Sequence, residues 1–220
     1  MAEMNLEQAR FNMIHQQIRP WEVLDDEVLG VLDRIPRDRF VPQAYRGLAY
    51  ADISIPLEHG QSMMPPRLEA KLLQALAIRP TDRILEVGTG SGFLTACLAT
   101  LGQHVYSVDI FSDFTIEAAK KLKEMGIENV TLETGDAING WDKHAPYDAI
   151  AITGSLPGLP EVFKQQLAVG GRLFAVLGDE PIREATLVTR SSDTEWVSEA
   201  LFETDLPELV NAPRRQTFTF

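Results

Sequence analysis

The chain has 220 residues, of which 45% are hydrophobic and 24% charged, the composition of a globular protein that buries a sizeable core. Lys and Arg number 20 and Asp and Glu number 32, so the formal net charge is −12. An acidic surface of this kind repels a phosphate backbone and argues against nucleic acid as a partner. The single cysteine, Cys97, excludes an intramolecular disulfide and a cysteine-rich zinc site.

The sequence indicates neither membrane insertion nor a metal centre. No apolar run approaches the length of a membrane-spanning helix, and the N-terminal residues are charged where a signal peptide needs an apolar stretch. The four histidines, His15, His59, His104 and His144, lack the paired spacing of metal ligands. We therefore expect a cytoplasmic protein with no metal and no membrane partner.

The first part of the chain, residues 1–67, is expected to be a helical and loop extension. Phe11, Ile14 and Ile18 recur at three- and four-residue intervals, which predicts one buried helix face. Prolines and glycines interrupt the periodicity from residue 36 onward, so little regular structure is expected over residues 36–67. The elements expected here are a helix ending at Pro20, a helix from near Asp25 to Ile35, and loops with a short strand over residues 36–67.

After a helix that begins at residue 68 and ends at Pro80, apolar β-branched runs alternate with helical stretches from residue 82 onward. This alternation predicts right-handed crossovers and a parallel sheet covered on both faces. After Pro181 the pattern becomes that of a hairpin, which predicts antiparallel strands at one edge. Residues 68–220 should thus form one α/β domain, with residues 1–67 packed on it as one unit. The expected strands are 83–87, 104–109, 129–134, 147–153, 172–178, 185–190 and 196–204, and the expected helices 68–80, 92–101, 114–125 and 160–167.

A glycine-rich loop gives the clearest indication of a ligand site. In LEVGTGSGF, residues 85–93, the glycines Gly88, Gly90 and Gly92 follow a strand and open a helix. Glycines there allow a tight turn and close approach of a ligand, at the carboxyl end of a strand where α/β sheets bind ligands. A dinucleotide fingerprint needs its third glycine at position 93, which is Phe93 here, so a nicotinamide cofactor is disfavoured.

Three acidic residues follow the first three strands of the α/β region. Glu86 precedes the glycine loop, where a carboxylate suits a cationic ligand better than a pyrophosphate. S-adenosylmethionine fits this requirement, since it carries an ammonium and a sulfonium but no phosphate. Asp109 ends the second strand, where a carboxylate commonly binds both ribose hydroxyls. Asp136 follows the third strand and is expected to accept a hydrogen bond from the adenine amino group.

Several stretches between Val41 and Gly178 resemble the protein-L-isoaspartate O-methyltransferase family. They are RFVPQAYRGLAYADISIPLEHGQS, LEVGTGSGF, HVYSVD, NVTLETGDAINGW, APYDAIAIT and LPEVFKQQLAVGGRL. The resemblance implies a class I methyltransferase (Rossmann-like) fold with a doubly wound seven-stranded sheet. It also implies that S-adenosylmethionine is the methyl donor, S-adenosylhomocysteine the product, and the isoaspartyl carboxylate of a damaged protein or peptide the acceptor. The cofactor-binding residues that it implies are Glu86, Gly88, Gly90, Ser91, Gly92, Asp109, Ile110, Asp136 and Ala137, the last a glycine in most of the family.

The chain departs from the family where the methyl acceptor should bind. The family reads Gly-Gln-Thr-Ile-Ser-x-Pro, with the serine in the active site, whereas residues 60–66 read Gly-Gln-Ser-Met-Met-Pro-Pro. Met64 thus stands at the position of the catalytic serine, and Ser62 replaces the threonine two positions earlier. We interpret Ser62 and Met64 as the candidate catalytic positions, and Ser62, Met63 and Met64 as candidate contacts of the cofactor. A second departure is the stretch TGSLPGLP over residues 153–160.

These departures leave other functions open beside isoaspartyl methylation. The protein could methylate another acceptor, such as a small molecule, or bind S-adenosylmethionine with its isoaspartyl activity lost. DNA and RNA amino-methyltransferases usually carry an Asn/Asp-Pro-Pro-aromatic motif after the fourth strand, and residues 153–156 read Thr-Gly-Ser-Leu instead. A nicotinamide-dependent oxidoreductase is disfavoured by Phe93 and by the predicted edge hairpin.

Overall fold

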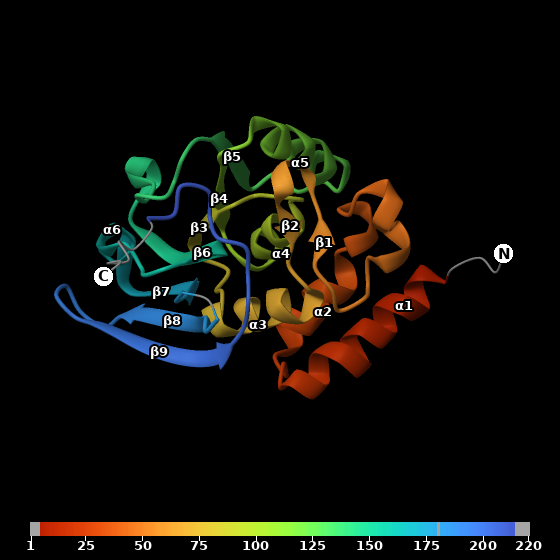
Figure 1. The fold of residues 1–220 in the computed structure, drawn as a ribbon, viewed down its shortest axis with the longest axis horizontal. Coiled ribbons are helices and arrows are strands. Elements are labelled where there is room, and N and C mark those ends of the chain that lie inside the picture. Colours follow the sequence, from red (N-terminus) through yellow and green to blue (C-terminus); the bar gives the residue numbers. More distant parts are fainter. Residues whose placement is uncertain (1–4, 180, 214–220) are drawn as a thin grey trace, which may run out of the picture.

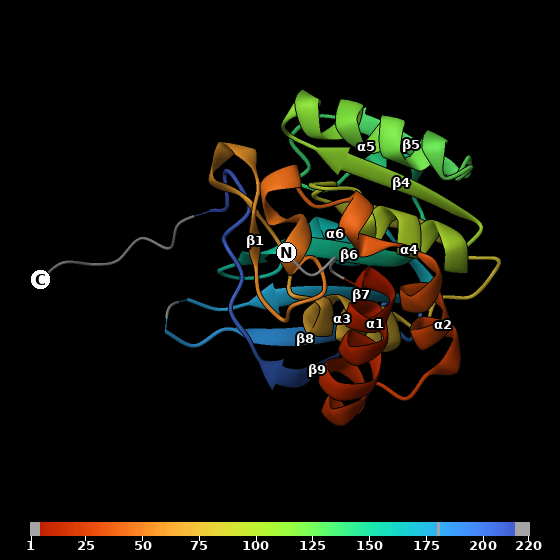
Figure 2. The same cartoon turned by 90° about the vertical axis from the view of Figure 1, so that its right-hand side faces the viewer.

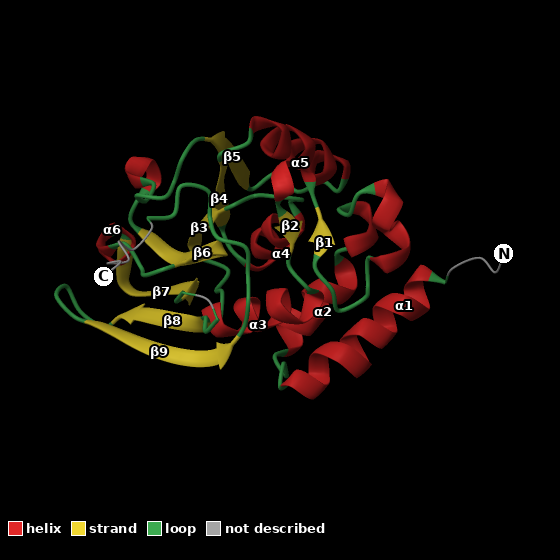
Figure 3. Cartoon of the chain, in the orientation of Figure 1, coloured by secondary structure: helices red, strands yellow, loops and turns green. Residues whose placement is uncertain are grey.

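A seven-stranded sheet forms the centre of the molecule (Figure 1). The computed structural model describes residues 5–179 and 181–213. The strands are β3 (Arg83–Val87), β4 (His104–Asp109), β5 (Val130–Thr134), β6 (Tyr147–Leu156), β7 (Leu167–Leu177), β8 (Glu184–Arg190) and β9 (Trp196–Glu203). Their order is β5-β4-β3-β6-β7-β8-β9, with β5 and β9 at the two edges (Figure 3). The strands β5, β4, β3, β6 and β7 are parallel to one another. β8 is antiparallel to both of its neighbours, β7 and β9, so the predicted sheet is confirmed.

Helices cover the sheet through two separate apolar clusters. The helices of this region are α3 (Pro66–Leu76), α4 (Phe93–Leu101), α5 (Ser112–Glu124) and α6 (Glu161–Gln165). Successive residues of a strand point to opposite faces. Ile84 accordingly packs in one cluster with α3, α4 and α5, whereas Leu85 packs in the other with Phe163 of α6. The N-terminal helices lie on the same side as α3 and α4 (Figure 2).

Pairing lengthens β6 and β7 beyond the predicted strands. The helix expected over residues 160–167 ends at Gln165, and Leu167 already pairs with Tyr147. At the other end, Ser155 pairs with Val176, past the predicted limit of the strand at residue 153. Apolar periodicity does not reveal which neighbour a residue pairs with, so the strand ends could not be read from sequence.

The N-terminal extension begins with α1 (Leu6–Asn12), continues as a π-helical segment and leads to α2 (Asp26–Arg34). Ile14 and Ile18 are buried, as predicted, but Phe11 is 52% exposed and its prediction was wrong. From Met13 the helix switches to π-type hydrogen bonding, which adds a residue per turn and rotates the buried face away from Phe11. The helix predicted near Asp25 is confirmed as α2. It begins there because the Asp25 carboxylate accepts hydrogen bonds from the backbone of its first turn.

A short hairpin follows this extension and is here named, together with Met64 after it, the flap (residues 55–64). It consists of β1 (Ile55–Pro56) and β2 (Ser62–Met63), joined by a 3-10 turn over Glu58–Gly60. The segment after β9 passes beside the flap (Figures 1 and 2). Extension and α/β region share one apolar cluster, while the boundary between residues 67 and 68 stays a prediction.

A buried arginine ties α3 to the sheet. Arg172 on β7 donates hydrogen bonds to the carbonyl oxygens of Leu76 (2.8 Å) and Ala77 (2.7 Å), which end α3 and have no partner within the helix. It also donates to the Asp148 carbonyl at 3.1 Å and to the Asp82 carboxylate at 2.6 Å. Asp82 is buried as well, so each charge depends on the other.

Removal of this guanidinium should destabilise the fold strongly. Arg172→Met leaves the Asp82 carboxylate buried without a cation, and we expect the free energy of unfolding to fall by about 3–5 kcal/mol. Urea denaturation at pH 7 measures it. The matched control is Lys120→Met, whose ammonium pairs with Glu117 on the surface and should cost less than about 1 kcal/mol. Equal losses in the two variants would contradict this account of Arg172.

Candidate functional site

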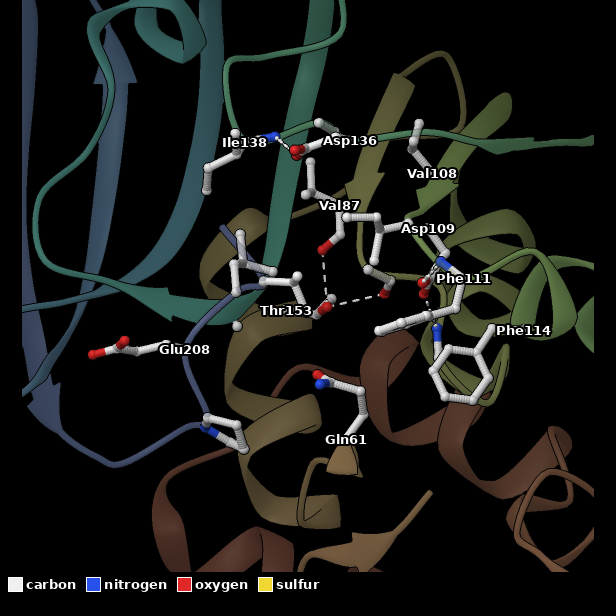
Figure 4. A pocket seen from close by; sticks show the side chains of 18 of the residues that line it. Gln61, Val87, Val108, Asp109, Phe111, Phe114, Asp136, Ile138, Thr153 and Glu208 are labelled. Atoms are coloured by element: carbon white, nitrogen blue, oxygen red, sulfur yellow. Dashed lines mark hydrogen bonds between the residues drawn. The ribbon is translucent and has the colours of Figure 1, made fainter. Parts of the chain in front are cut away.

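A cavity with about 690 Å³ of empty space opens at the carboxyl ends of β3, β4 and β6 (Figure 4). We name it the first cavity. Its walls are Leu57, Gln61 and Ser62 of the flap, Val87, Gly88 and Gly90, Val108–Phe111, Phe114, Gly135–Ile138, Thr153, Gly154, and Pro207–Val210.

The glycine loop bounds this cavity with backbone conformations that favour glycine. Gly88 and Gly90 have φ angles of 96° and 50°, in the left-handed region. A Cβ atom on Gly88 would lie 2.1 Å from Oγ1 of Thr153, so only glycine fits there. Gly92 lines neither this cavity nor the one described below. A Cβ there would lie 2.9 Å from the Cβ of Ala118, so the visible role of Gly92 is close packing of α4 on α5.

Thr153 fixes the loop from the neighbouring strand and was missed by the sequence analysis as a site residue. Its hydroxyl lies within hydrogen-bond distance of the carbonyl oxygens of Val87 (2.8 Å) and Gly88 (2.9 Å), as Figure 4 shows. The available signal was its place at the predicted end of the fourth strand, where polar residues reach ligand sites. The segment Pro207–Val210 also lines the cavity, and no motif indicated it.

Asp109 joins the two loops that bound the cavity. It is 6% exposed at the end of β4, and its carboxylate accepts hydrogen bonds from the backbone N–H groups of Gly90 (2.9 Å) and Phe111 (3.0 Å). Burial raises the pKa of Asp109, although these N–H donors oppose the shift. Each carboxylate oxygen has a second lone pair, so Asp109 keeps acceptor capacity for a ligand.

Asp136 and Ala137 line the same cavity on the β5 side. Asp136 is exposed, and its carboxylate accepts hydrogen bonds from the backbone of Ile138 (3.0 Å) and from the side-chain amide of Asn211 (2.8 Å). Ala137 is buried, which shows that its methyl group is accommodated in the loop. Asn211 thus connects the C-terminal segment to a predicted ligand-binding carboxylate.

A second cavity, with about 320 Å³ of empty space, adjoins the first. The two share Leu57, Ser62, Gly88, Gly90 and Thr153. The residues that line only the second cavity are Met63, Met64, Glu69, Glu86, Thr89, Ser91 and Leu94. The predicted site residues are therefore divided between two connected spaces.

Glu86 is completely buried in this second cavity. One carboxylate oxygen accepts hydrogen bonds from the hydroxyls of Thr95 and Ser107, each at 2.5 Å. Burial in an apolar environment raises the pKa of Glu86 to about 8, against the effect of these two hydroxyls. The other carboxylate oxygen has no hydrogen-bond partner among the described residues.

The flap places Ser62 and Met64 differently. Ser62 lines both cavities, whereas Met64 lines only the second and is 5% exposed. The carbonyl oxygen of Met64 accepts a hydrogen bond from Arg37 at 2.5 Å, and its thioether is at best a weak acceptor. The hydroxyl group available at the junction of the cavities therefore belongs to Ser62.

His59 holds the flap against α5. Its Nε2 lies 2.7 Å from the carboxylate of Asp113, and its ring stacks on Phe111 at 4.1 Å and an interplanar angle of 5°. Phe111 and Phe114 also line the first cavity. Among the described residues, His59 is thus a hydrogen-bonded residue of the flap turn.

Comparison with known proteins identifies the family. The model of the family described as Protein-L-isoaspartate(D-aspartate) O-methyltransferase matches residues 8–210. The chain belongs to this family. The protein-L-isoaspartate O-methyltransferase 2 of Marinobacter nauticus is 36% identical over 193 residues, 87% of this chain and 88% of that protein. The protein-L-isoaspartate O-methyltransferase of Opitutus terrae is 40% identical over 176 residues, 78% of this chain and 76% of that protein.

Solved structures agree with the family at the level of the fold. A protein-L-isoaspartate O-methyltransferase that is 25% identical has a TM-score of 0.77, over 93% of this chain and 65% of that chain. A Plasmodium falciparum structure in complex with S-adenosyl-L-homocysteine is 20% identical and also has a TM-score of 0.77, over 94% and 99% of the two chains. The class I methyltransferase fold that the sequence predicted is thereby confirmed.

The burial of Glu86 predicts a pH-dependent stability. Its pKa is higher in the folded protein than in the unfolded chain, so the folded state keeps the proton longer. The contribution of Glu86 to the free energy of unfolding therefore falls as pH rises from about 5 to about 8. Glu86→Gln removes this titration, so the variant should gain stability relative to wild type across that range, by roughly a few kcal/mol. Urea denaturation at several pH values measures the difference, and a constant difference would contradict the prediction.

Proposed function

We propose that this protein is a protein-L-isoaspartate O-methyltransferase that takes its methyl group from S-adenosylmethionine and acts in protein repair. The observation that carries the proposal is the match of the family model over residues 8–210, with the glycine loop lining a cavity at the carboxyl ends of the strands. Two alternatives use the same glycine loop: methylation of another acceptor, and binding of the cofactor without methyl transfer. They differ from the proposal only in the role that they give to the flap.

The charges of the cavities fit this cofactor. Acidic residues line both: Asp109, Asp136 and Glu208 the first, and Glu69 and Glu86 the second. Within residues 5–179 and 181–213, no Lys or Arg lines either cavity. A pyrophosphate would be repelled by such walls, whereas a sulfonium and an ammonium would be attracted. The donor and acceptor set thus favours S-adenosylmethionine over a dinucleotide.

We assign the cofactor contacts by position in the cavities. Asp109 would accept hydrogen bonds from the ribose hydroxyls, Asp136 from the adenine amino group, and Glu86 from the amino group of the methionine part. Gly88 and Gly90 leave room for close approach. Ile110 and Ala137 would contact the adenosine in the first cavity, and Ser91, Met63 and Met64 the methionine part in the second. For Gly92 we propose an indirect role, through the packing of α4.

The chemistry demands little of the protein beyond orientation. When bound, S-adenosylmethionine would supply an electrophilic methyl group attached to a sulfonium. The methyl group goes to the acceptor oxygen, and the sulfur is left as a neutral thioether. A carboxylate acceptor, with an ordinary pKa near 4, is already ionised at neutral pH and needs no general base. The chain therefore has to hold the acceptor oxygen in line and exclude water. Ser62 and the amide of Gln61 are the flap donors at the first cavity, and the rings of Phe111 and Phe114 give it an apolar wall.

One observation favours a second candidate, methylation of a different acceptor. Among the described residues, the cavity walls offer no Lys or Arg to an acceptor carboxylate, and Met63 and Met64 add an apolar surface at the flap. A neutral or cationic small molecule would meet less repulsion there than an isoaspartyl carboxylate. The same methyl-transfer assay separates the two candidates, because only the first predicts labelled isoaspartyl peptide.

We place the reaction in the cytoplasm, with damaged proteins or peptides as partners and without nucleic acid or a membrane. The net charge of −12 supports the exclusion of nucleic acid. Among the helices of the described residues, none has the length and apolar character needed to cross a bilayer.

The ribose contact is tested by Asp109→Ala. Loss of the carboxylate removes charged hydrogen bonds to the ribose, each worth roughly 1.5–3 kcal/mol, and also frees the Gly90 and Phe111 N–H groups. We expect S-adenosylhomocysteine to bind correspondingly more weakly in isothermal titration calorimetry. Asp193→Ala, in the turn between β8 and β9, is the control. Undiminished affinity in Asp109→Ala would place the ribose elsewhere.

The acceptor end is tested by Met64→Ser with an isoaspartyl peptide and its aspartyl control. Restoring a hydroxyl at the family's position should raise the rate of radiolabelled methyl transfer by roughly 100- to 1,000-fold, by comparison with single oxyanion donors. The affinity for S-adenosylhomocysteine should stay nearly unchanged. If wild type already works at full rate and Ser62→Ala abolishes transfer, Ser62 has taken over the role. If neither protein labels the peptide, another acceptor is the better account.

A further inference from the structure

Two buried carboxyl groups from different elements line the second cavity. Glu86 belongs to β3, beside the glycine loop, and Glu69 belongs to the first turn of α3. Their exposed fractions are 0% and 2%. The cavity has no basic residue in its described walls. Acidic side chains are this deeply buried only where another group compensates their charge or supplies hydrogen bonds.

Each carboxyl group keeps an oxygen without a hydrogen bond. Oε1 of Glu86 and Oε2 of Glu69 are buried, and neither accepts a hydrogen bond from the described residues. Oε2 of Glu86, in contrast, accepts from Thr95 and Ser107. Unused acceptors on two acids around one cavity match a ligand group that carries several N–H donors.

The charges around the cavity are also incompletely balanced. Nη1 of Arg37 lies 3.4 Å from Oε2 of Glu69, without the geometry of a hydrogen bond, and Nη2 donates to the Met64 carbonyl oxygen. Arg37 is fully buried and does not line the cavity. One guanidinium beside two carboxylates leaves this cluster one positive charge short when both acids are ionised.

We propose that Glu69 acts together with Glu86 to hold the ammonium group of the cofactor's amino-acid end in the second cavity. An ammonium brings three N–H donors and the missing positive charge. The second cavity shares Gly88 and Gly90 with the first, so one ligand can extend through both. The inference rests on the proposed cofactor and adds to it Glu69, which lies outside the glycine loop and outside the motif of residues 60–66.

Binding of the ammonium should change the protonation of both acids. Burial raises the pKa of Glu69 to about 7 and that of Glu86 to about 8 without a ligand. The ionisable groups that face the two acids are Arg37, Cys97 and Asp109, besides each other. A bound ammonium favours the ionised carboxylates and lowers both pKa values. Binding at neutral pH therefore releases protons, and affinity rises with pH between 6 and 8.

The experiment compares two ligands on the wild-type protein. S-adenosylhomocysteine carries the ammonium, and its deaminated analogue keeps the carboxylate and lacks only the amino group. Calorimetry at pH 7 in buffers of different ionisation enthalpy gives the number of protons released. We expect release of about half to one proton with S-adenosylhomocysteine, none with the analogue, and at least roughly 10-fold weaker binding of the analogue.

Variants assign the effect to Glu69. Glu69→Gln should weaken S-adenosylhomocysteine by roughly 10-fold or more and reduce proton release, while the deaminated analogue binds as in wild type. The analogue thereby reports damage from leaving Arg37 without its counter-charge, which would weaken both ligands equally. Glu208→Gln, an acid of the first cavity that pairs with Arg183, is the matched control and should keep the discrimination. If Glu69→Gln does not fold, Glu69→Asp is compared in its place, because it keeps a counter-charge for Arg37 while it withdraws the carboxylate, and it should weaken S-adenosylhomocysteine more than the analogue.

Equal affinities of the two ligands, or no proton release, would overturn the proposal. Weakening of both ligands to the same extent in Glu69→Gln would overturn the part assigned to Glu69. These outcomes are independent of the methyl acceptor, since a protein that discriminates the ligands and still fails to methylate an isoaspartyl peptide contradicts only the proposed acceptor. Failure of S-adenosylhomocysteine to bind at all would overturn both the cofactor and this inference.

Discussion

The shape of the ligand site depends on one buried carboxylate. Asp109 accepts hydrogen bonds from Gly90 in the loop after β3 and from Phe111 in the loop after β4, so it fixes two walls of the first cavity relative to each other. Thr153 fixes the same glycine loop from β6. These contacts bind backbone groups of both loops and hold them in one geometry, and the Asp109 carboxylate still offers lone pairs to a ligand.

Negative charge then becomes the property that selects the ligand. Three of these acids, Glu86, Asp109 and Asp136, are brought together by the parallel order of β3, β4 and β5, whose carboxyl ends meet at one edge of the sheet. Glu86 shows the energetic cost, since burial raises its pKa far above the ordinary value. A cationic ligand relieves that cost, and an anionic one would increase it. The arrangement is therefore unfavourable to the empty, fully ionised state and favourable to a sulfonium with an ammonium.

The sequence predicted what local patterns determine. Strand–helix alternation predicted the sheet. The glycines, together with Glu86, Asp109 and Asp136, predicted that the ligand site lies at the carboxyl ends of its strands. It could not predict contacts between segments far apart in the chain. Glu69 looks like an ordinary polar residue in the first turn of a helix, and only the packing of α3 against the glycine loop makes it a wall of the second cavity. The predicted burial of Phe11 was wrong for a related reason. The change to π-type hydrogen bonding at Met13 cannot be recognised from the spacing of apolar residues.

The geometry of the flap decides how far Ser62 can replace a serine at position 64. Met64 precedes Pro65, which restricts it to an extended conformation, and Ser62 lies in β2, so the two residues stand on one continuous extended segment. Residues two apart on such a segment are separated by about 7 Å and point to the same side. An acceptor placed for a hydroxyl at position 64 is therefore out of hydrogen-bond reach of Ser62. Either β2 slides along its pairing with β1 or the acceptor binds differently, and in both cases Asp109 and Asp136 stay in place at the opposite wall of the first cavity.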